Sequence, residues 1–176
     1  MIARHDDLEV RYVTRLAELD AAQALRYRVF FEELGAVAGV AARRHGRDID
    51  PLDEHADHLV VVDTRRSTGG IPHVVGCYRL LRASVARRVG GFYSAAEFDL
   101  DGLGRAGGEV LELGRSCVDA GYRNGAVVPL LWRGIADYLD RHGCTLMFGC
   151  ASLPGTDVAA VARPIPALAP VTTSVR

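Results

Sequence analysis

An acid-rich run at residues 48–55 is the first place in the sequence where side chains could do chemistry. It reads Asp48-Ile-Asp-Pro-Leu-Asp-Glu-His, and Asp57 and His58 follow closely. The run lacks the glycine and the terminal Glu of an EF-hand loop, and the chain has no His-Glu-x-x-His motif, so we expect no metal site. Two interpretations remain open: a solvated acidic loop, and a carboxylate cluster that faces a substrate and holds its ammonium group.

A second candidate is Glu112, which shares the apolar run Glu109–Val118 with Gly114 and Arg115. Alternation along a strand places Glu112 and Gly114 on the face opposite the leucines of the run. One interpretation is an exposed sheet face on which Glu112 pairs with an arginine of the neighbouring strand, such as Arg79. The other is a carboxylate beside an opening in the sheet, ordered by guanidinium groups, with a bulge at Gly114.

The third candidate is the turn Tyr122-Arg123-Asn124-Gly125-Ala126, which leads into an apolar helix. Pro129 lies in the first turn of that helix, where proline is favoured. Free backbone amides at a helix N-terminus bind phosphate groups, so we predict an anion site here.

The cysteines and the lack of an export signal indicate a cytoplasmic protein. Cys77, Cys117, Cys144 and Cys150 lie in apolar runs without Cys-x-x-Cys spacing, and we expect buried, reduced thiols. Cys117 and Cys150 could instead accept an acyl group as nucleophiles. The sequence shows no signal peptide and no apolar run near the roughly 20 residues that cross a bilayer.

The composition excludes several classes of protein. With 176 residues, 49% of them hydrophobic and 24% charged, the chain fits one globular domain. Its 21 basic and 22 acidic residues leave a net charge of -1, so we expect no nucleic-acid partner. Every basic residue is Arg. Without Lys the chain cannot form a Schiff base, use a lysine base or build the usual P-loop.

The pattern of apolar residues predicts the elements that position these groups. We expect a strand, a helix, two hairpin strands, a short helix, a strand, a helix and a strand, in this order: residues 8–13, 16–34, 58–63, 73–81, 93–98, 109–118, 127–142 and 144–151. The acidic run falls in a long loop over residues 35–57, and such loops are often functional. Strands in hairpin order followed by one crossover predict an α+β fold, a mixed central sheet with flanking helices.

Taken together, these segments resemble the GNAT superfamily of N-acyltransferases. Over residues 8–157 the chain is similar to the branch shared by acyl-homoserine-lactone synthases and the ornithine N-acyltransferases of ornithine-lipid synthesis. Four motifs carry the resemblance: Arg26-Tyr-Arg-Val-Phe30, Asp50-Pro-Leu-Asp53, Gly76-Cys-Tyr-Arg-Leu-Leu81 and Glu112-Leu-Gly-Arg115. Residues 92–98, residues 148–152 together with 155–157, and Ala36, where lactone synthases usually carry Trp, favour the ornithine enzymes.

The resemblance implies a GNAT-like domain over residues 1–157, incomplete at its C-terminus, and a Pro/Ala-rich irregular tail over residues 158–176. The implied enzyme moves a (3-hydroxy)fatty acyl group from acyl carrier protein to the α-amino group of L-ornithine, the first step of ornithine-lipid biosynthesis. Its donor substrate is a phosphopantetheine thioester, no further cofactor is implied, and the lipid product implies peripheral membrane association. Two alternatives stay open: a lactone synthase or another GNAT acyltransferase, and an inactive truncated fragment that binds acyl carrier protein.

The resemblance also implies roles for individual residues. Glu112 would take a proton from the acceptor amine, and Arg115 would bind the acceptor carboxylate. The remaining substrate-binding residues are Arg26, Phe30, Asp50, Asp53 and Arg79, with Asp50 or Asp53 holding an ammonium group. The donor site comprises Cys117, Val118, Arg123, Asn124 and Gly125, with backbone amides near residues 117–119 stabilising an oxyanion. A docking patch for the acidic carrier comprises Arg82, Arg87 and Arg88.

Overall fold

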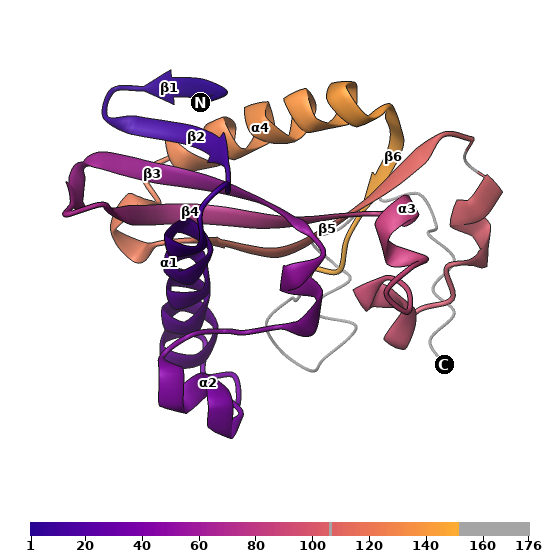
Figure 1. Ribbon diagram of the computed structural model, residues 1–176, viewed down its shortest axis with the longest axis horizontal. Coiled ribbons are helices and arrows are strands. Elements are labelled where there is room, and N and C mark those ends of the chain that lie inside the picture. The colour runs from indigo at the N-terminus through magenta and orange to yellow at the C-terminus, as the bar shows by residue number, and fades with distance from the viewer. Residues whose placement is uncertain (106, 152–176) are drawn as a thin grey trace, which may run out of the picture.

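A six-stranded sheet organises the chain in the computed structural model, which describes residues 1–105 and 107–151 (Figure 1). Its strands are β1 (Ala3–His5), β2 (Leu8–Tyr12), β3 (Asp57–Thr68), β4 (Ile71–Arg82), β5 (Glu109–Val118) and β6 (Cys144–Phe148). They lie side by side in chain order, antiparallel except for the parallel pair β5 and β6. The predicted mixed sheet is therefore confirmed.

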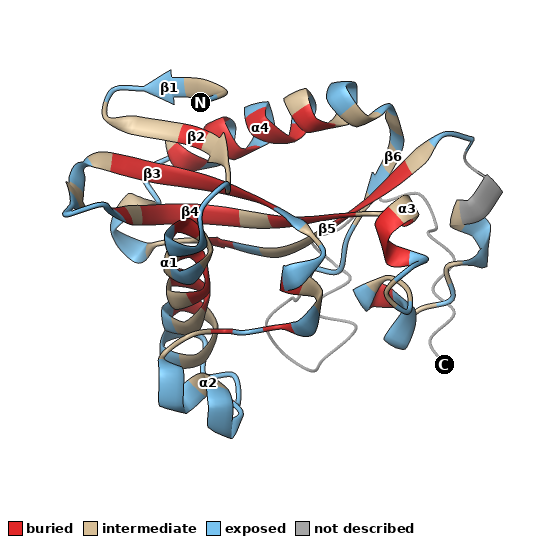
Figure 2. Cartoon of the chain, viewed as in Figure 1, coloured by how far each residue is buried: buried red, intermediate tan, exposed pale blue. Residues whose placement is uncertain are grey.

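Helices cover both faces of this sheet (Figure 1). On one face, α4 (Val127–His142) packs its Leu131 into a core with Leu59 of β3. On the other face, α1 (Leu16–Tyr27) packs its Leu25 into a core with Val60. Successive residues of β3 thus face opposite layers, as the period of a strand requires. Figure 2 shows the buried residues running along β3, β4 and the inner side of α4.

The remaining helical elements are short. α1 continues as a π-helical turn over Arg28–Glu33, so the predicted helix over residues 16–34 is confirmed in extent but changes its hydrogen bonding. The others are α2 (Val40–His45), α3 (Ala83–Ala86) and the 3₁₀ turns Pro51–Glu54, Tyr93–Ala96, Asp101–Arg105 and Ala120–Tyr122. Within the described ranges, no helix has both the length and the apolar character needed to span a membrane.

The structure differs from the expected elements at several points. A short strand, β1, precedes the first predicted one, and α2 lies inside the segment expected to be loop. The hairpin strands β3 and β4 are longer than predicted because Gly69 and Gly70, both at positive φ, make a tight turn between them. β6 ends at Phe148 rather than at residue 151. The expected boundary at residues 157–158, the motif at residues 155–157 and the irregular tail lie outside the described residues.

β5 carries a bulge and then separates from β6. Cys117 pairs with Cys77 and Gly114 pairs with Arg79, so β5 has one more residue than β4 between these two pairs. Within the bulge Arg115 has a φ of 52°, which is unusual for a residue with a side chain. The pairing of β5 with β6 ends at Glu112. The sheet therefore opens at the part of β5 that was predicted to hold a site.

Gly149→Ala tests how closely the residue after β6 approaches β5, just beyond the last pair of the two strands. A Cβ at this position would collide with the backbone carbonyl oxygen of Leu113, which cannot move aside as a flexible side chain can. We expect the variant to lose about 1–3 kcal/mol of unfolding free energy, measured by urea denaturation. Gly39→Ala is the matched control, because no atom lies within 4 Å of the position that its Cβ would take. Equal stability of the two variants would contradict this account of the strand contact.

Candidate active site

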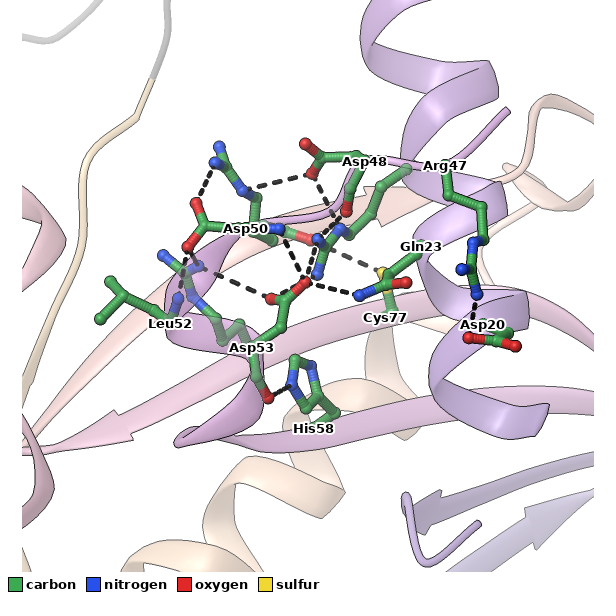
Figure 3. A network of polar contacts seen from close by, with 12 residues as sticks. Asp20, Gln23, Arg47, Asp48, Asp50, Leu52, Asp53, His58 and Cys77 are labelled. Carbon is green, nitrogen blue, oxygen red and sulfur yellow. Dashed lines mark hydrogen bonds and ion pairs between the residues drawn. The ribbon is translucent and has the colours of Figure 1, made fainter. Parts of the chain in front are cut away.

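Three arginines and three aspartates from four separate segments form one buried ion cluster. Its members are Arg26 of α1, Asp48, Asp50 and Asp53 of the acidic run, Arg79 of β4 and Arg115 of β5. Figure 3 shows Asp48, Asp50 and Asp53 grouped with Gln23 and His58 above the sheet. The acidic run is therefore a structural partner of three distant arginines.

Arg26 is the most buried member of the ion cluster, with a side chain that is 1% exposed. Its Nε lies 2.9 Å from Asp48 Oδ2, and its Nη2 lies 2.6 Å from Asp53 Oδ2. Gln23 Nε2 also donates to Asp53 Oδ2, at 2.9 Å. The Asp53 backbone carbonyl accepts from His58 Nε2 at 3.0 Å. Asp53 is thus held on every side by protein groups.

Arg79 and Arg115 lie on the cleft side of the ion cluster and share Asp50. Arg79 Nη1 is 2.8 Å from Asp50 Oδ1, and Arg115 Nη2 is 2.6 Å from Asp50 Oδ2. Arg115 Nε lies 3.3 Å from Asp48 Oδ2. The bulge in β5 places Arg115 where it can reach both aspartates, which gives its unusual backbone conformation a structural role.

These contacts determine the protonation of the aspartates. Burial alone would raise the pKa of Asp50, but the Arg79 charge and hydrogen bonds from Leu52 and Arg115 outweigh burial and lower it. Burial likewise opposes ionisation of Asp53, whose pKa is lowered by Arg26 and Gln23. The interpretation as a solvated acidic loop is therefore wrong. Because both carboxylates are occupied by guanidinium groups, neither is free to hold a substrate ammonium group by itself.

The same cluster predicts a loss of stability on acidification. Burial lowers the pKa of His58, so below about pH 6.5 the unfolded chain binds a proton that the folded chain does not. The lowered pKa values of Asp50 and Asp53 stabilise the fold above about pH 4, and this contribution is lost as the pH falls further. We expect urea midpoints to fall from pH 7 to 5 and again below pH 4.

His58→Gln should flatten the first of these two declines, because glutamine does not titrate. His45→Gln, at an exposed position on α2, is the matched control and should keep the decline. Midpoints of the unchanged chain that stay constant from pH 7 to 5 would contradict the assignment to His58.

A cleft of about 900 Å³ lies beside the ion cluster, where β5 and β6 separate. Of the predicted site residues it is lined by Phe30, Arg79, Glu112 and Arg115. Arg26, Asp50 and Asp53 do not line it but support Arg79 and Arg115 from behind. The structure thus separates the predicted substrate-binding residues into a cleft wall and a buried layer beneath it.

Glu112 is buried at the inner end of the cleft, with 3% exposure. Its carboxylate accepts from Tyr93 N at 2.9 Å, from Ser94 N at 2.8 Å and from the Ser94 hydroxyl at 2.6 Å. Its cross-strand neighbour is Leu81, and Arg79 pairs with Asp50 instead. The interpretation as an exposed cross-strand pair of Glu112 with Arg79 is therefore wrong.

Several residues of this site were not predicted from the sequence. Tyr93 lines the cleft with its ring 5.2 Å from the Arg115 guanidinium carbon and 5.7 Å from that of Arg79. Ser94 lines it too and contacts Glu112. Both belong to the run at residues 92–98, which carried the resemblance but received no role. Asp48 was noted only as part of the acidic run.

The predicted donor-site cysteine is not accessible. Cys117 is buried against Cys77, its register partner on β4, with the two sulfur atoms 3.5 Å apart. The hydrogen bond with Cys77 and burial both raise the pKa of Cys117, which opposes the thiolate that a nucleophile needs. Cys150, expected to be buried, is instead exposed and lines the cleft.

The predicted phosphate-binding residues lie at the N-terminal end of α4 and outside the lining of the cleft. Arg123 is bound to Glu33, with Nη2 2.8 Å from Glu33 Oε2, and also donates to Val118 O. Asn124 Oδ1 accepts from the Ala126 amide at 3.3 Å, and Gly125 has a φ of 97°. Of these three residues, Arg123 contacts the end of β5, through its bonds to Val118 O.

The predicted docking patch is smaller than expected. Arg82 is held by two neighbouring elements: its Nη2 lies 3.5 Å from Asp57 of β3, and its Nη1 lies 3.2 Å from His142 Nδ1 of α4. Arg87 and Arg88, just after α3, are exposed. Two of the three arginines therefore remain available at the surface.

Relatives with assigned names are similar over most of this chain. The L-ornithine N(alpha)-acyltransferase of Rhizobium meliloti (strain 1021) is 48% identical over 157 residues, which are 88% of this chain and 53% of the relative. The L-ornithine N(alpha)-acyltransferase of Rhodobacter capsulatus is 42% identical over 157 residues, 89% of this chain and 61% of the relative. The chain thus spans little more than half the length of these relatives, and the predicted similarity to ornithine acyltransferases is confirmed.

Solved structures and a family model agree on the fold. The acyl-homoserine-lactone synthase LasI superposes with a TM-score of 0.55 at 15% identity, covering 90% of this chain and 76% of LasI. A ribosomal-protein-alanine N-acetyltransferase from Brucella melitensis biovar Abortus 2308 superposes with a TM-score of 0.51 at 12% identity, covering 96% of this chain and 97% of the acetyltransferase. Residues 25–133 match the model described as an acetyltransferase (GNAT) domain. The sheet that opens beside β5 is thus a GNAT sheet, and the chain belongs to the GNAT acetyltransferase family.

Proposed function

We propose that this chain acts as an N-acyltransferase that moves a fatty acyl group, including 3-hydroxylated ones, from acyl carrier protein to the α-amino group of L-ornithine. This reaction is the first step of ornithine-lipid biosynthesis. The observation that carries the proposal is the cleft in which buried Glu112 lies near Arg79 and Arg115, where β5 leaves β6. Similarity to ornithine acyltransferases along most of the chain supports the choice of acceptor.

The chemistry requires a base and a site for negative charge. The α-ammonium group must lose a proton before its nitrogen can attack the thioester carbonyl. In the proposal Glu112 receives that proton, a C–N bond forms, the C–S bond breaks, and the pantetheine sulfur leaves as the thiol with the second amine proton. Backbone amides of Cys117 and Val118 stabilise the oxyanion of the tetrahedral intermediate.

Arg115 is the proposed partner of the acceptor carboxylate. The ion cluster engages its Nε and Nη2, which leaves Nη1 without a partner among the described residues. A carboxylate bound there would be held by a charge-assisted hydrogen bond beside the Tyr93 ring. Phe30 supplies an apolar wall of the same cleft.

The donor is proposed to approach from the other end of β5. Arg123, Asn124 and Gly125, in the turn that leads into α4, would receive the phosphate of the phosphopantetheine arm. The exposed Arg87 and Arg88 would contact the acidic carrier protein. This donor implies a cytoplasmic reaction, and the lipid product implies peripheral contact with a membrane.

The proposal is tested by mixing the purified 176-residue chain with 3-hydroxyacyl carrier protein and ornithine, and detecting products by mass spectrometry. Homoserine and S-adenosylmethionine are parallel acceptors. N-acyl-ornithine is the expected product. A lactone product from S-adenosylmethionine, or binding of the carrier protein without consumption of the thioester, would overturn the proposed reaction.

A further inference from the structure

Glu112 is almost closed off from the cleft whose chemistry it is proposed to serve. The carboxylate is covered by the turn Tyr93–Ala96, which directs two backbone amides and one hydroxyl onto it. Only 3% of the residue is exposed. A substrate amine in the cleft therefore needs an intermediate group to pass a proton to Glu112.

Ser94 provides a side chain in the required place. Its hydroxyl donates to Glu112 Oε1 at 2.6 Å, and the Cys150 thiol donates to the same hydroxyl oxygen at 3.0 Å. Cys150 is exposed and lines the cleft, whereas Ser94 is 2% exposed. A continuous hydrogen-bonded line thus runs from the cleft through Ser94 to the carboxylate. A hydroxyl can donate one proton while it accepts another, as a relay requires.

We propose that the Ser94 hydroxyl relays a proton from the acceptor ammonium group to Glu112, an inference that rests on the proposed function. The ammonium N–H takes the place of the Cys150 thiol, which is exposed and can turn away. The Ser94 proton moves to Glu112 Oε1 as Ser94 Oγ takes the proton from nitrogen. The hydroxyl is regenerated, the amine becomes neutral, and Glu112 later releases the proton to water.

A purely structural role for Ser94 would give a different result. Its backbone amide, which also binds Glu112, is retained in any substitution. Ser94→Ala removes the hydroxyl alone, and Ser94→Thr restores one. Ser84→Ala is the matched control, because Ser84 also donates its backbone amide to a β5 glutamate, Glu109, outside the cleft.

The first test measures kcat and KM for ornithine in these three variants. We expect Ser94→Ala to lower kcat by about 10- to 100-fold with little change in KM, because general-base catalysis is lost and binding is not. Ser94→Thr should recover most of kcat, and Ser84→Ala should match the unchanged chain. Rates in H₂O–D₂O mixtures should indicate two moving protons in the unchanged chain and fewer in Ser94→Ala. Full activity of Ser94→Ala would overturn the relay.

The second test needs no turnover and separates failure of the relay from failure of the proposed function. Alkylation of Cys150 by iodoacetamide is followed by peptide mass spectrometry, with Cys144 as the internal reference. Loss of the hydroxyl that accepts from the thiol should speed alkylation several-fold in Ser94→Ala but not in Ser94→Thr. Identical rates would overturn the hydrogen-bonded line. If the predicted rates hold but no ornithine is acylated, the proposed function fails and the relay geometry stands.

Discussion

Arg26→Met is expected to lower the free energy of unfolding by about 3–5 kcal/mol, measured by urea denaturation at pH 7. The guanidinium is 1% exposed and is the main counterion of Asp53, which is itself buried. Methionine fills similar space but leaves Asp48 and Asp53 with a buried, uncompensated charge. The cost of that charge exceeds the loss of any single hydrogen bond.

The pH dependence of this variant distinguishes charge from packing. Without Arg26 the pKa of Asp53 rises, so acidification neutralises its buried, uncompensated charge. The difference in stability from the unchanged chain should therefore shrink. Arg28→Met is the matched control. Arg28 is exposed, with one 3.4 Å ion pair to Asp119, and should cost no more than about 0.5 kcal/mol. A deficit for Arg26→Met that is equal at all pH values would show that packing is responsible.

Glu112→Gln is expected to lower kcat by about 10²- to 10⁴-fold in the mass-spectrometric assay. Glutamine keeps the size of the side chain but cannot take the proton of the acceptor. Its amide nitrogen would also face the donors Tyr93 N or Ser94 N, so one of these hydrogen bonds is lost. A modest fall in melting temperature should therefore accompany the large fall in rate.

Glu109→Gln provides the control for this substitution. Glu109 lies on the same strand and accepts from the Ser84 amide at 3.0 Å, but it does not line the cleft. Its replacement should leave kcat unchanged. A Glu112→Gln variant that retains most of the activity while losing stability would restrict Glu112 to holding the turn Tyr93–Ala96.

The order of the elements and the face of each strand could be predicted because both follow from local patterns. Alternation placed Glu112 opposite Leu111 and Leu113, and the structure puts these leucines in the core with α4. The bulge was expected at Gly114, whereas the positive φ falls on Arg115. This backbone conformation depends on residues far away in the sequence, because the bulge directs the Arg115 side chain to Asp48 and Asp50.

The partners within the site could not be predicted in the same way. Residue types identified the arginines and aspartates, but which of them pair depends on how α1, β4 and β5 converge on the acidic run. The donors to Glu112 include two backbone amides, and because every residue except proline has such an amide, residue types cannot identify them. Cys150 was misjudged because β6 ends two residues before it, so the apolar run continues beyond the sheet.

Electroneutrality of the ion cluster governs the field inside the cleft. Three guanidinium groups and three carboxylates cancel, so this wall carries dipoles but no net charge. Among the described residues that line the cleft, Glu112 is the one acidic or basic group outside this cluster, and its carboxylate adds a negative charge. An amino acid with two ammonium groups and one carboxylate carries one net positive charge, and its entry leaves the site neutral. Long-range attraction thus favours a basic amino acid over a neutral one, and added salt should weaken that preference.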